Sequence, residues 1–246
     1  FSRSEKEKLG GARALYFARV YRDGRKNRLL RRRRRDYYGE IVIDSTTIAG
    51  LSAICKGQGK PLLMLHGYLS SKESFIRQID FFARFRRVIA VDMSGFGKSP
   101  PIKYPYSLDD YAREIKRVLD EIGADKADLL AHSFGARVAV RLLKSEKRID
   151  KIDFTGAAGL TPRRNFRYAV RRASFLILKN FLPREKLTKF YSSDYVNLSP
   201  VMRESFKKII ADNLDGEYAK ISNRTLLIFG KNDTETPLYM ARKMNK

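Results

Sequence analysis

The chain has 246 residues and a mass of 28.4 kDa, which suits one large domain or two small ones. Hydrophobic residues make up 43% of the sequence and aromatic residues 11%, a composition that excludes a chain disordered throughout. The single cysteine, Cys55, excludes an internal disulfide framework and a cysteine-rich zinc site. Only His66 and His132 carry imidazole, so we expect no histidine-rich metal centre.

The sequence holds no uninterrupted apolar run of about 18 residues, so we expect no transmembrane helix. No secretory signal opens the chain, although it begins at Phe1 rather than Met, which is consistent with a missing N-terminus. One free cysteine without a signal fits a reducing compartment, and we predict a cytoplasmic location.

The net charge of +24 favours contact with an acidic substrate, a nucleic acid or an anionic membrane surface. Residues 1–36 hold fourteen Lys and Arg against four acidic residues, and this segment ends in five arginines, 31–35. Adjacent guanidinium groups repel each other, so we predict a disordered, solvated arm, with membrane-surface contact as the alternative. Nucleic-acid binding is disfavoured, because no aromatic-interleaved basic motif or zinc finger accompanies the charge.

Strand and helix patterns alternate along the chain from residue 40. Short apolar runs predict strands over 40–44, 51–55, 61–65, 87–92, 127–131, 151–156 and 225–230. Amphipathic patterns predict helices over 70–83, 108–123 and 134–146. The alternation predicts an α/β fold, a mostly parallel, doubly wound sheet with helices on both faces.

The pattern breaks in residues 159–220, which lack strand signals and hold thirteen Lys and Arg against six acidic residues. We predict that this segment is a helical cap inserted into a core formed by 37–158 and 221–246. The chain stops in the helix that would precede a last strand, so we expect that the last strand and helix are missing. The strand at 225–230 would then be left as an open apolar edge.

The stretch from Asp128 to Val140 carries the strongest chemical signal. An apolar strand ends at Ala131 and a helix begins just past Ser133, with Gly135 two residues beyond. A nucleophile elbow needs this arrangement, because the turn is sharp and its flanking residues must be small. The alternative is that Ser133 is an ordinary helix cap.

Two further segments supply partners for such a nucleophile. Gly67 lets the chain turn over a strand end, so that the N–H groups of Tyr68 and Phe134 could form a two-donor oxyanion hole. Asp233 follows a late buried strand, where an acid can hold the tautomer of a catalytic imidazole. Glu235 is the less favoured alternative, because it lies deeper in the loop.

The order of the motifs PLLMLHGY, DMSGFGKS, AHSFGA and GKNDTETP resembles the α/β-hydrolase superfamily over about residues 40–246. It looks closest to capped small-molecule hydrolases of the proline iminopeptidase, haloperoxidase and menaquinone-pathway synthase types. The resemblance implies that Ser133 is the nucleophile, Asp233 the triad acid, and Tyr68 and Phe134 the oxyanion donors. It also implies a set of residues that shape the site: His66, Gly67, Asp92, Gly95, Gly97, His132 and Gly135.

Two features depart from the family pattern. Ala131 replaces the first glycine of the elbow, a small change, and no histidine follows Asp233 to serve as general base. We expect the side chain of His132 to point away from the Ser133 hydroxyl, and we expect His66 to have a structural role. The general base is therefore expected beyond residue 246, in a part of the protein that this chain lacks.

A serine nucleophile favours acyl transfer on a small ester, thioester, amide or related carbonyl substrate, with no metal or organic cofactor. The alternatives are C–C lyase or synthase chemistry of the menaquinone-pathway type and a non-catalytic binding protein on the same fold. The pairs Arg163–Arg164 and Arg171–Arg172 in the cap are candidates to meet a carboxylate on an anionic substrate.

Overall fold

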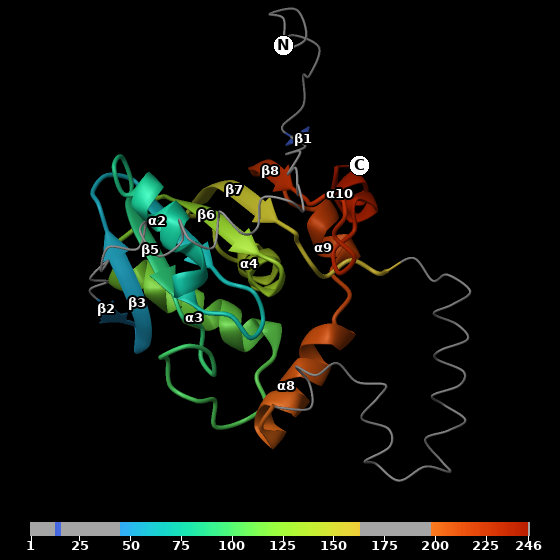
Figure 1. The fold of residues 1–246 in the computed structure, drawn as a ribbon, viewed down its shortest axis with the longest axis horizontal. Coiled ribbons are helices and arrows are strands. Elements are labelled where there is room, and N and C mark those ends of the chain that lie inside the picture. The colour runs from blue at the N-terminus through green and yellow to red at the C-terminus, as the bar shows by residue number, and fades with distance from the viewer. Residues whose placement is uncertain (1–12, 16–44, 163–197, 246) are drawn as a thin grey trace, which may run out of the picture.

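The computed structural model describes residues 13–15, 45–162 and 198–245, and its fold is drawn in Figure 1. The predicted strand at 40–44, most of the basic arm, residues 163–197 of the predicted cap and both arginine pairs lie outside the described residues. The described strands form one eight-stranded sheet in the order β1-β8-β7-β6-β4-β5-β3-β2.

The sheet is mostly parallel, as predicted. β2 and β3 form an antiparallel hairpin, β3 pairs antiparallel with β5, and all other neighbouring strands pair in parallel. The strand bounds are β1 Arg13–Leu15, β2 Ser45–Ile48, β3 Leu51–Lys56, β4 Pro61–Leu65, β5 Arg87–Val91, β6 Ala127–His132, β7 Ile149–Thr155 and β8 Arg224–Ile228.

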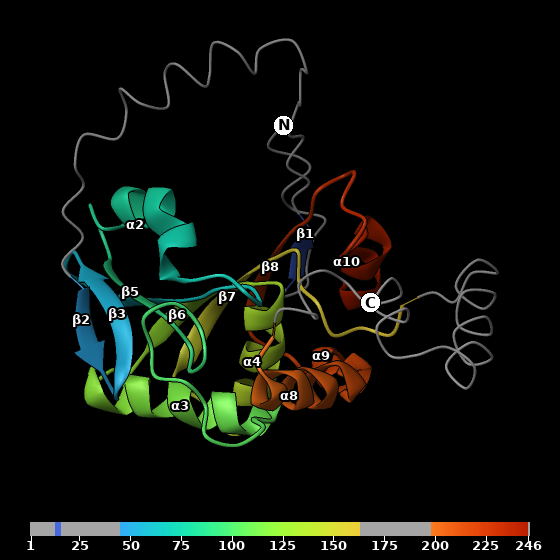
Figure 2. The same ribbon diagram turned by 60° about the horizontal axis from the view of Figure 1, so that its bottom comes forward.

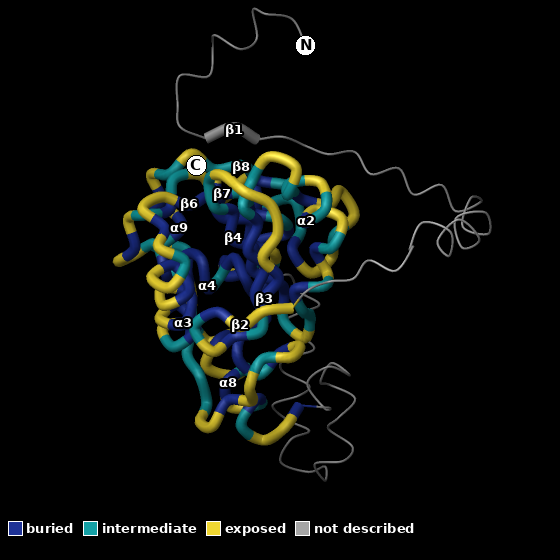
Figure 3. Tube along the Cα trace, turned by 90° about the vertical axis from the view of Figure 1, so that its left-hand side faces the viewer, coloured by how far each residue is buried: buried dark blue, intermediate teal, exposed yellow. Residues whose placement is uncertain are grey.

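The central strands β4, β5 and β6 are buried on both faces, which explains their continuous apolar sequences. The tube in Figure 3 shows this buried interior enclosed by exposed loops and helix faces. Because these strands run in parallel, their carboxyl ends meet at one edge, where the motif loops after β4, β5 and β6 come together.

The described helices are α2 Ile76–Phe82, preceded by a 3₁₀ turn Lys72–Phe75, then α3 Leu108–Glu121, α4 Phe134–Leu143, α8 Pro200–Ala211, α9 Asp215–Ala219 and α10 Leu238–Met244. Figure 2 shows α2 on one face of the sheet and α3 and α4 on the other, as the alternation predicts. Ser107 begins α3 with a reciprocal capping box to Asp110, which fixes where this helix starts.

The arm contributes one element that the sequence analysis did not predict. β1 lies within residues 1–36 and pairs in parallel with β8, with Arg13 opposite Thr225 and Leu15 opposite Leu227. The expectation of an open edge on β8 is therefore wrong over Thr225–Leu227. A three-residue strand paired across more than 200 positions leaves no local pattern in the sequence, which explains why the analysis missed it.

Within the part of the chain that the structure describes, no helix is both long and apolar enough to span a bilayer.

Candidate active site

Ser133 occupies the tight turn between β6 and α4. Its backbone has φ +48° and ψ −106°, a conformation that is costly for a residue with a side chain. The turn is held by the Ser133 N–H, which donates to the Thr155 carbonyl at 3.1 Å, and by the Ser133 carbonyl, which accepts from Ala136 N–H at 3.1 Å. This is the strand–turn–helix geometry that the sequence predicts for a nucleophile elbow.

The elbow fits against the end of β4 only because Gly135 has no side chain. A Cβ on Gly135 would stand 2.3 Å from the backbone oxygen of Leu65, and one on Gly67 would stand 3.1 Å from Cδ2 of His132. The first contact is with backbone, which cannot give way locally. Gly135, two residues after Ser133, therefore allows the close spacing between β4 and α4.

Replacing Gly135 with alanine should destabilise the protein by about 1–3 kcal/mol, the usual cost of overpacking, and displace the elbow. Gly216 is the matched control, because it lies in α9 and a Cβ there would meet nothing within 4 Å. Urea unfolding compares the two variants. Equal free energies of unfolding for Gly135→Ala and Gly216→Ala would show that the close approach of Gly135 to β4 does not exclude a side chain.

The loop after β4 carries Tyr68, whose backbone N–H is one of the two predicted oxyanion donors. Ser70 N–H donates to Gly67 O at 3.2 Å and closes a turn in which Leu69 has φ +54°. Among the described residues, neither the N–H of Tyr68 nor that of Phe134 makes a hydrogen bond. Within the described part of the chain, both predicted oxyanion donors are thus without a hydrogen-bond partner.

The side chain of Tyr68 anchors this loop in an aromatic cluster. Its ring packs edge-on against Phe96 at 4.9 Å and Phe134 at 5.3 Å between centroids, and also contacts Phe206 of α8. Its hydroxyl donates to the Met202 carbonyl at 3.3 Å, and burial raises its pKa well above the ordinary value. Tyr68 therefore contributes its backbone to the site while its side chain positions the loop.

Asp233 lies in the loop after β8 and is held by its own loop. Its Oδ1 accepts from the N–H groups of Glu235 and Thr236, each at 2.9 Å, and its Oδ2 accepts from the Thr236 hydroxyl at 2.7 Å. Burial acts to raise the pKa of Asp233, but these hydrogen bonds and the nearby His132 outweigh it and hold that pKa below its usual value. Asp233 is therefore ionised at neutral pH. The side chain of Glu235 is exposed, and Glu235 contributes its N–H instead.

The loops after β6, β7 and β8 meet around Gly156. A Cβ on Gly156 would lie 3.5 Å from Asp233 Oδ2, 3.0 Å from Thr236 Oγ1 and 3.6 Å from His132 Cε1. The structure thus brings the predicted acid to the same strand ends as the elbow.

The two histidines differ in environment. His66 is fully buried, its Nδ1 faces Gly67 O at 2.7 Å, and its Nε2 accepts from Met93 N–H at 3.1 Å. Burial lowers its pKa, so the ring is neutral and both its nitrogens are used within the fold. His132 is exposed, and its Nδ1 faces the carbonyl and hydroxyl of Thr155 at 2.9 and 3.1 Å. Among the described residues, Ser133 Oγ has no hydrogen-bond partner.

The glycine loop after β5 packs over a buried ion pair. Asp92 accepts from Lys72 Nζ at 2.6 Å, from Lys72 N–H at 2.7 Å and from Lys98 N–H at 2.9 Å, and both charged side chains are fully buried. A Cβ on Gly97 would stand 2.3 Å from the Asp92 carboxyl, and one on Gly95 would stand 2.8 Å from Met202 Sδ. Gly95 and Gly97 thus let this loop pack closely against Met202 and the Asp92 carboxyl.

Sequence reasoning missed Lys72 and Met202. Lys72 lies in the first turn of the helix predicted over 70–83, where a lysine ordinarily faces solvent. Its burial depends on a partner 20 positions away, which no local pattern shows. Met202 lies in α8, and its contact with Gly95 joins two segments that are distant in sequence. Among the described residues, no three His, Cys, Asp or Glu side chains are grouped as metal ligands.

Comparison with known proteins agrees with this arrangement. A family model described as the alpha/beta hydrolase fold matches residues 60–168. The 2-hydroxymuconate semialdehyde hydrolase of Pseudomonas sp. (strain CF600) is 34% identical over 110 residues, which are 43% of this chain and 39% of that protein. The chain therefore spans well under half the length of that relative.

Longer but more distant similarities extend over most of the chain. The AB hydrolase superfamily protein YisY of Bacillus subtilis (strain 168) is 24% identical over 77% of this chain and 80% of its own length. The crystallised esterase of Exiguobacterium antarcticum superposes with a TM-score of 0.61 at 23% identity, covering 81% of this chain and 85% of its own, a likeness of fold. The parallel sheet, the strained serine turn and the matching family model show that the chain has the α/β-hydrolase fold and is similar to members of the α/β-hydrolase superfamily.

Proposed function

We propose that the protein is a serine-dependent hydrolase that acts on a small ester, thioester, amide or related carbonyl compound through an acyl-enzyme on Ser133. One observation carries the proposal. Ser133 is held in a strained turn at the start of α4, beside two backbone N–H groups that have no partner among the described residues. Strain of this kind persists where the surrounding fold enforces it, and it clusters at functional sites.

In this mechanism the hydroxyl of Ser133 attacks the substrate carbonyl carbon while a general base removes its proton. The developing oxyanion accepts hydrogen bonds from the N–H groups of Tyr68 and Phe134, and the N-terminus of α4 adds a positive potential. The leaving group departs with a proton from the base, and water then releases the acid. Asp233, ionised and held by Thr236, orients the base and stabilises its cationic form.

The base itself is proposed to be a histidine downstream of Asp233, as the family resemblance implies. His66 is unsuitable, because both its ring nitrogens are used inside the fold. His132 neighbours the nucleophile, but its Nδ1 is directed to Thr155.

We therefore expect His132→Gln to lower kcat only a few-fold in the natural protein, while Asp233→Asn lowers it by about 10² or more. Steady-state kinetics on one ester measures both variants. A loss for His132→Gln as large as that for Asp233→Asn would instead make His132 the base.

The proposed function is tested by rapid mixing with p-nitrophenyl acetate. We expect a burst of p-nitrophenol equal to the enzyme concentration, followed by slower turnover, and a mass increase of one acetyl group in the quenched protein. Neither burst nor turnover with a panel of small esters, thioesters and amides would favour the non-catalytic binding protein.

A second candidate is hydrolysis of a carbon–carbon bond on the same serine. It is favoured by the similarity of this chain to the 2-hydroxymuconate semialdehyde hydrolase of Pseudomonas sp. (strain CF600). The test is turnover of 2-hydroxymuconate semialdehyde beside p-nitrophenyl acetate. A kcat/KM at least about tenfold higher for the semialdehyde would select this candidate, and the reverse ratio would select the ester hydrolase.

A further inference from the structure

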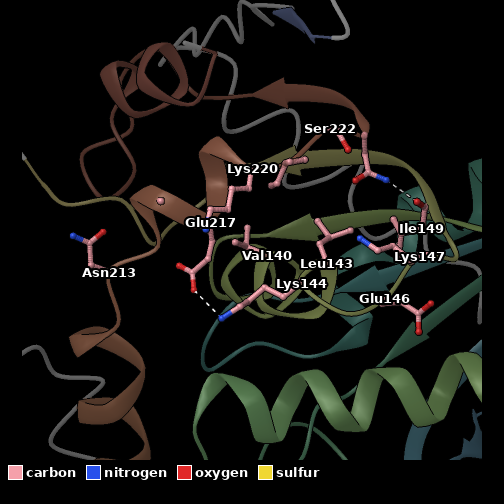
Figure 4. Close-up of a pocket in the computed structure, with 13 residues that line it drawn as sticks. Val140, Leu143, Lys144, Glu146, Lys147, Ile149, Asn213, Glu217, Lys220 and Ser222 are labelled. Atoms are coloured by element: carbon pink, nitrogen blue, oxygen red, sulfur yellow. Dashed lines mark hydrogen bonds and ion pairs between the residues drawn. The ribbon is translucent and has the colours of Figure 1, made fainter.

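A pocket of about 560 Å³ lies remote from the serine turn, at the other end of α4 (Figure 4). It is bounded by the last turn of α4, the loop leading to β7, helix α9 and the segment that leads into β8. Ser133 precedes the first residue of α4, and Val140, the first pocket residue on this helix, lies seven residues beyond Ser133, about 10 Å along the helix axis. The pocket is therefore no part of the site described above.

The pocket combines an apolar base with a basic rim. Val140, Leu143, Ile149 and Ile221 contribute the apolar surface. The rim carries three exposed lysines from three different elements: Lys144, Lys147 and Lys220.

Both glutamates at the pocket form ion pairs with basic side chains of the protein. Glu146 binds Arg148 through both carboxylate oxygens at 2.9 and 2.6 Å, which lowers the pKa of Glu146 to about 2. Glu217 lies 3.5 Å from Arg141 and 3.7 Å from Lys144, and Figure 4 shows Lys144 directed to it.

The remaining two lysines carry the unbalanced charge. Among the described residues, neither Lys147 nor Lys220 forms an ion pair. The pocket therefore holds a surplus of positive charge that its own carboxylates do not neutralise.

Two of the three rim lysines are explained by their positions at the C-terminal ends of helices. Lys144 and Lys220 are the C-caps of α4 and α9, where a cation offsets the negative end of the helix dipole. Lys147 belongs to neither helix, and it extends the basic rim beyond what the two dipoles require. The pocket also offers a hydrogen-bonding group, since Asn223 donates to Ile149 O at 2.6 Å and its side-chain oxygen accepts no hydrogen bond from the residues that the structure describes.

We propose that this pocket binds an organic anion that carries a phosphate or carboxylate head on a short apolar body. The head is held by Lys147 and Lys220, and the body lies on the apolar surface between α4 and β7. Binding here is independent of the proposed hydrolase function, because no residue of the pocket belongs to the serine site.

Calorimetric titration of the natural protein with octyl phosphate tests the proposal. We expect binding of one equivalent, at least about tenfold tighter than inorganic phosphate or octanol, because head and tail each contribute. The double variant Lys147→Gln/Lys220→Gln should weaken it at least about tenfold. The control Lys103→Gln/Lys126→Gln removes the same charge from exposed lysines elsewhere and should leave it within about twofold.

Blocking the serine site with a fluorophosphonate before the titration separates this pocket from the catalytic centre. Unchanged binding of octyl phosphate to the blocked protein is expected. Absence of binding, equal losses in both double variants, or loss of binding on blocking the serine would each overturn the proposal.

Discussion

Replacing Ser133 with alanine should lower kcat for p-nitrophenyl acetate by about 10⁴ or more, because the acyl-enzyme then cannot form. The residual rate would come from substrate binding and from the free N–H groups of Tyr68 and Phe134, which remain in place. Steady-state kinetics measures the loss. Thermal unfolding of the same variant should be nearly unchanged, since alanine keeps the backbone of the turn and its hydrogen bonds.

Ser74→Ala is the matched control for this experiment. Ser74 is exposed in the 3₁₀ turn before α2, and its loss should leave kcat within about twofold. If Ser133→Ala retained ester hydrolysis within about tenfold of the wild-type rate, Ser133 would not be the nucleophile.

Lys72→Met should destabilise the protein by about 3–5 kcal/mol, because it leaves the fully buried carboxylate of Asp92 without its cation. The double variant Lys72→Met/Asp92→Asn should recover most of this loss. Its side chains carry no charge, and the asparagine oxygen still accepts from one of the two backbone N–H groups, of Lys72 and Lys98, that donate to different oxygens of Asp92. Urea unfolding of the three proteins gives the coupling energy between the two positions.

Lys56→Met provides the comparison for this ion pair. Lys56 also binds an aspartate, Asp80 at 2.8 Å, but its side chain is 52% exposed, and such pairs contribute about 1 kcal/mol or less. Equal destabilisation by Lys72→Met and Lys56→Met would show that burial of the Asp92 pair does not support the glycine loop.

Most of the fold could be predicted because its signals are local. A strand buried on both faces is apolar throughout, as in Leu62–Leu65, and Ser107 begins α3 with a capping residue that sequence alone reveals. β1 could not be predicted, since its pairing with β8 depends on a partner more than 200 residues away. The expected open edge on β8 was wrong for that reason.

The positions of the candidate site residues in the fold were predictable for the same reason, while their catalytic roles stay predictions. Ser133, Gly135 and Asp233 follow or precede strands, so their positions come from the order of elements. The surroundings of the site were less accessible. The buried position of Lys72, the contact of Met202 with Gly95 and the meeting of Asp233 with His132 around Gly156 join distant segments, and only the folded chain shows them.

The most direct measurement of the central claim is the site of covalent labelling. The natural protein is treated with a fluorophosphonate, digested, and its peptides are sequenced by mass spectrometry. The account predicts one phosphonylated residue, Ser133, in the peptide that joins β6 to α4. An adduct on another residue, or no adduct in a preparation that hydrolyses esters, would contradict it.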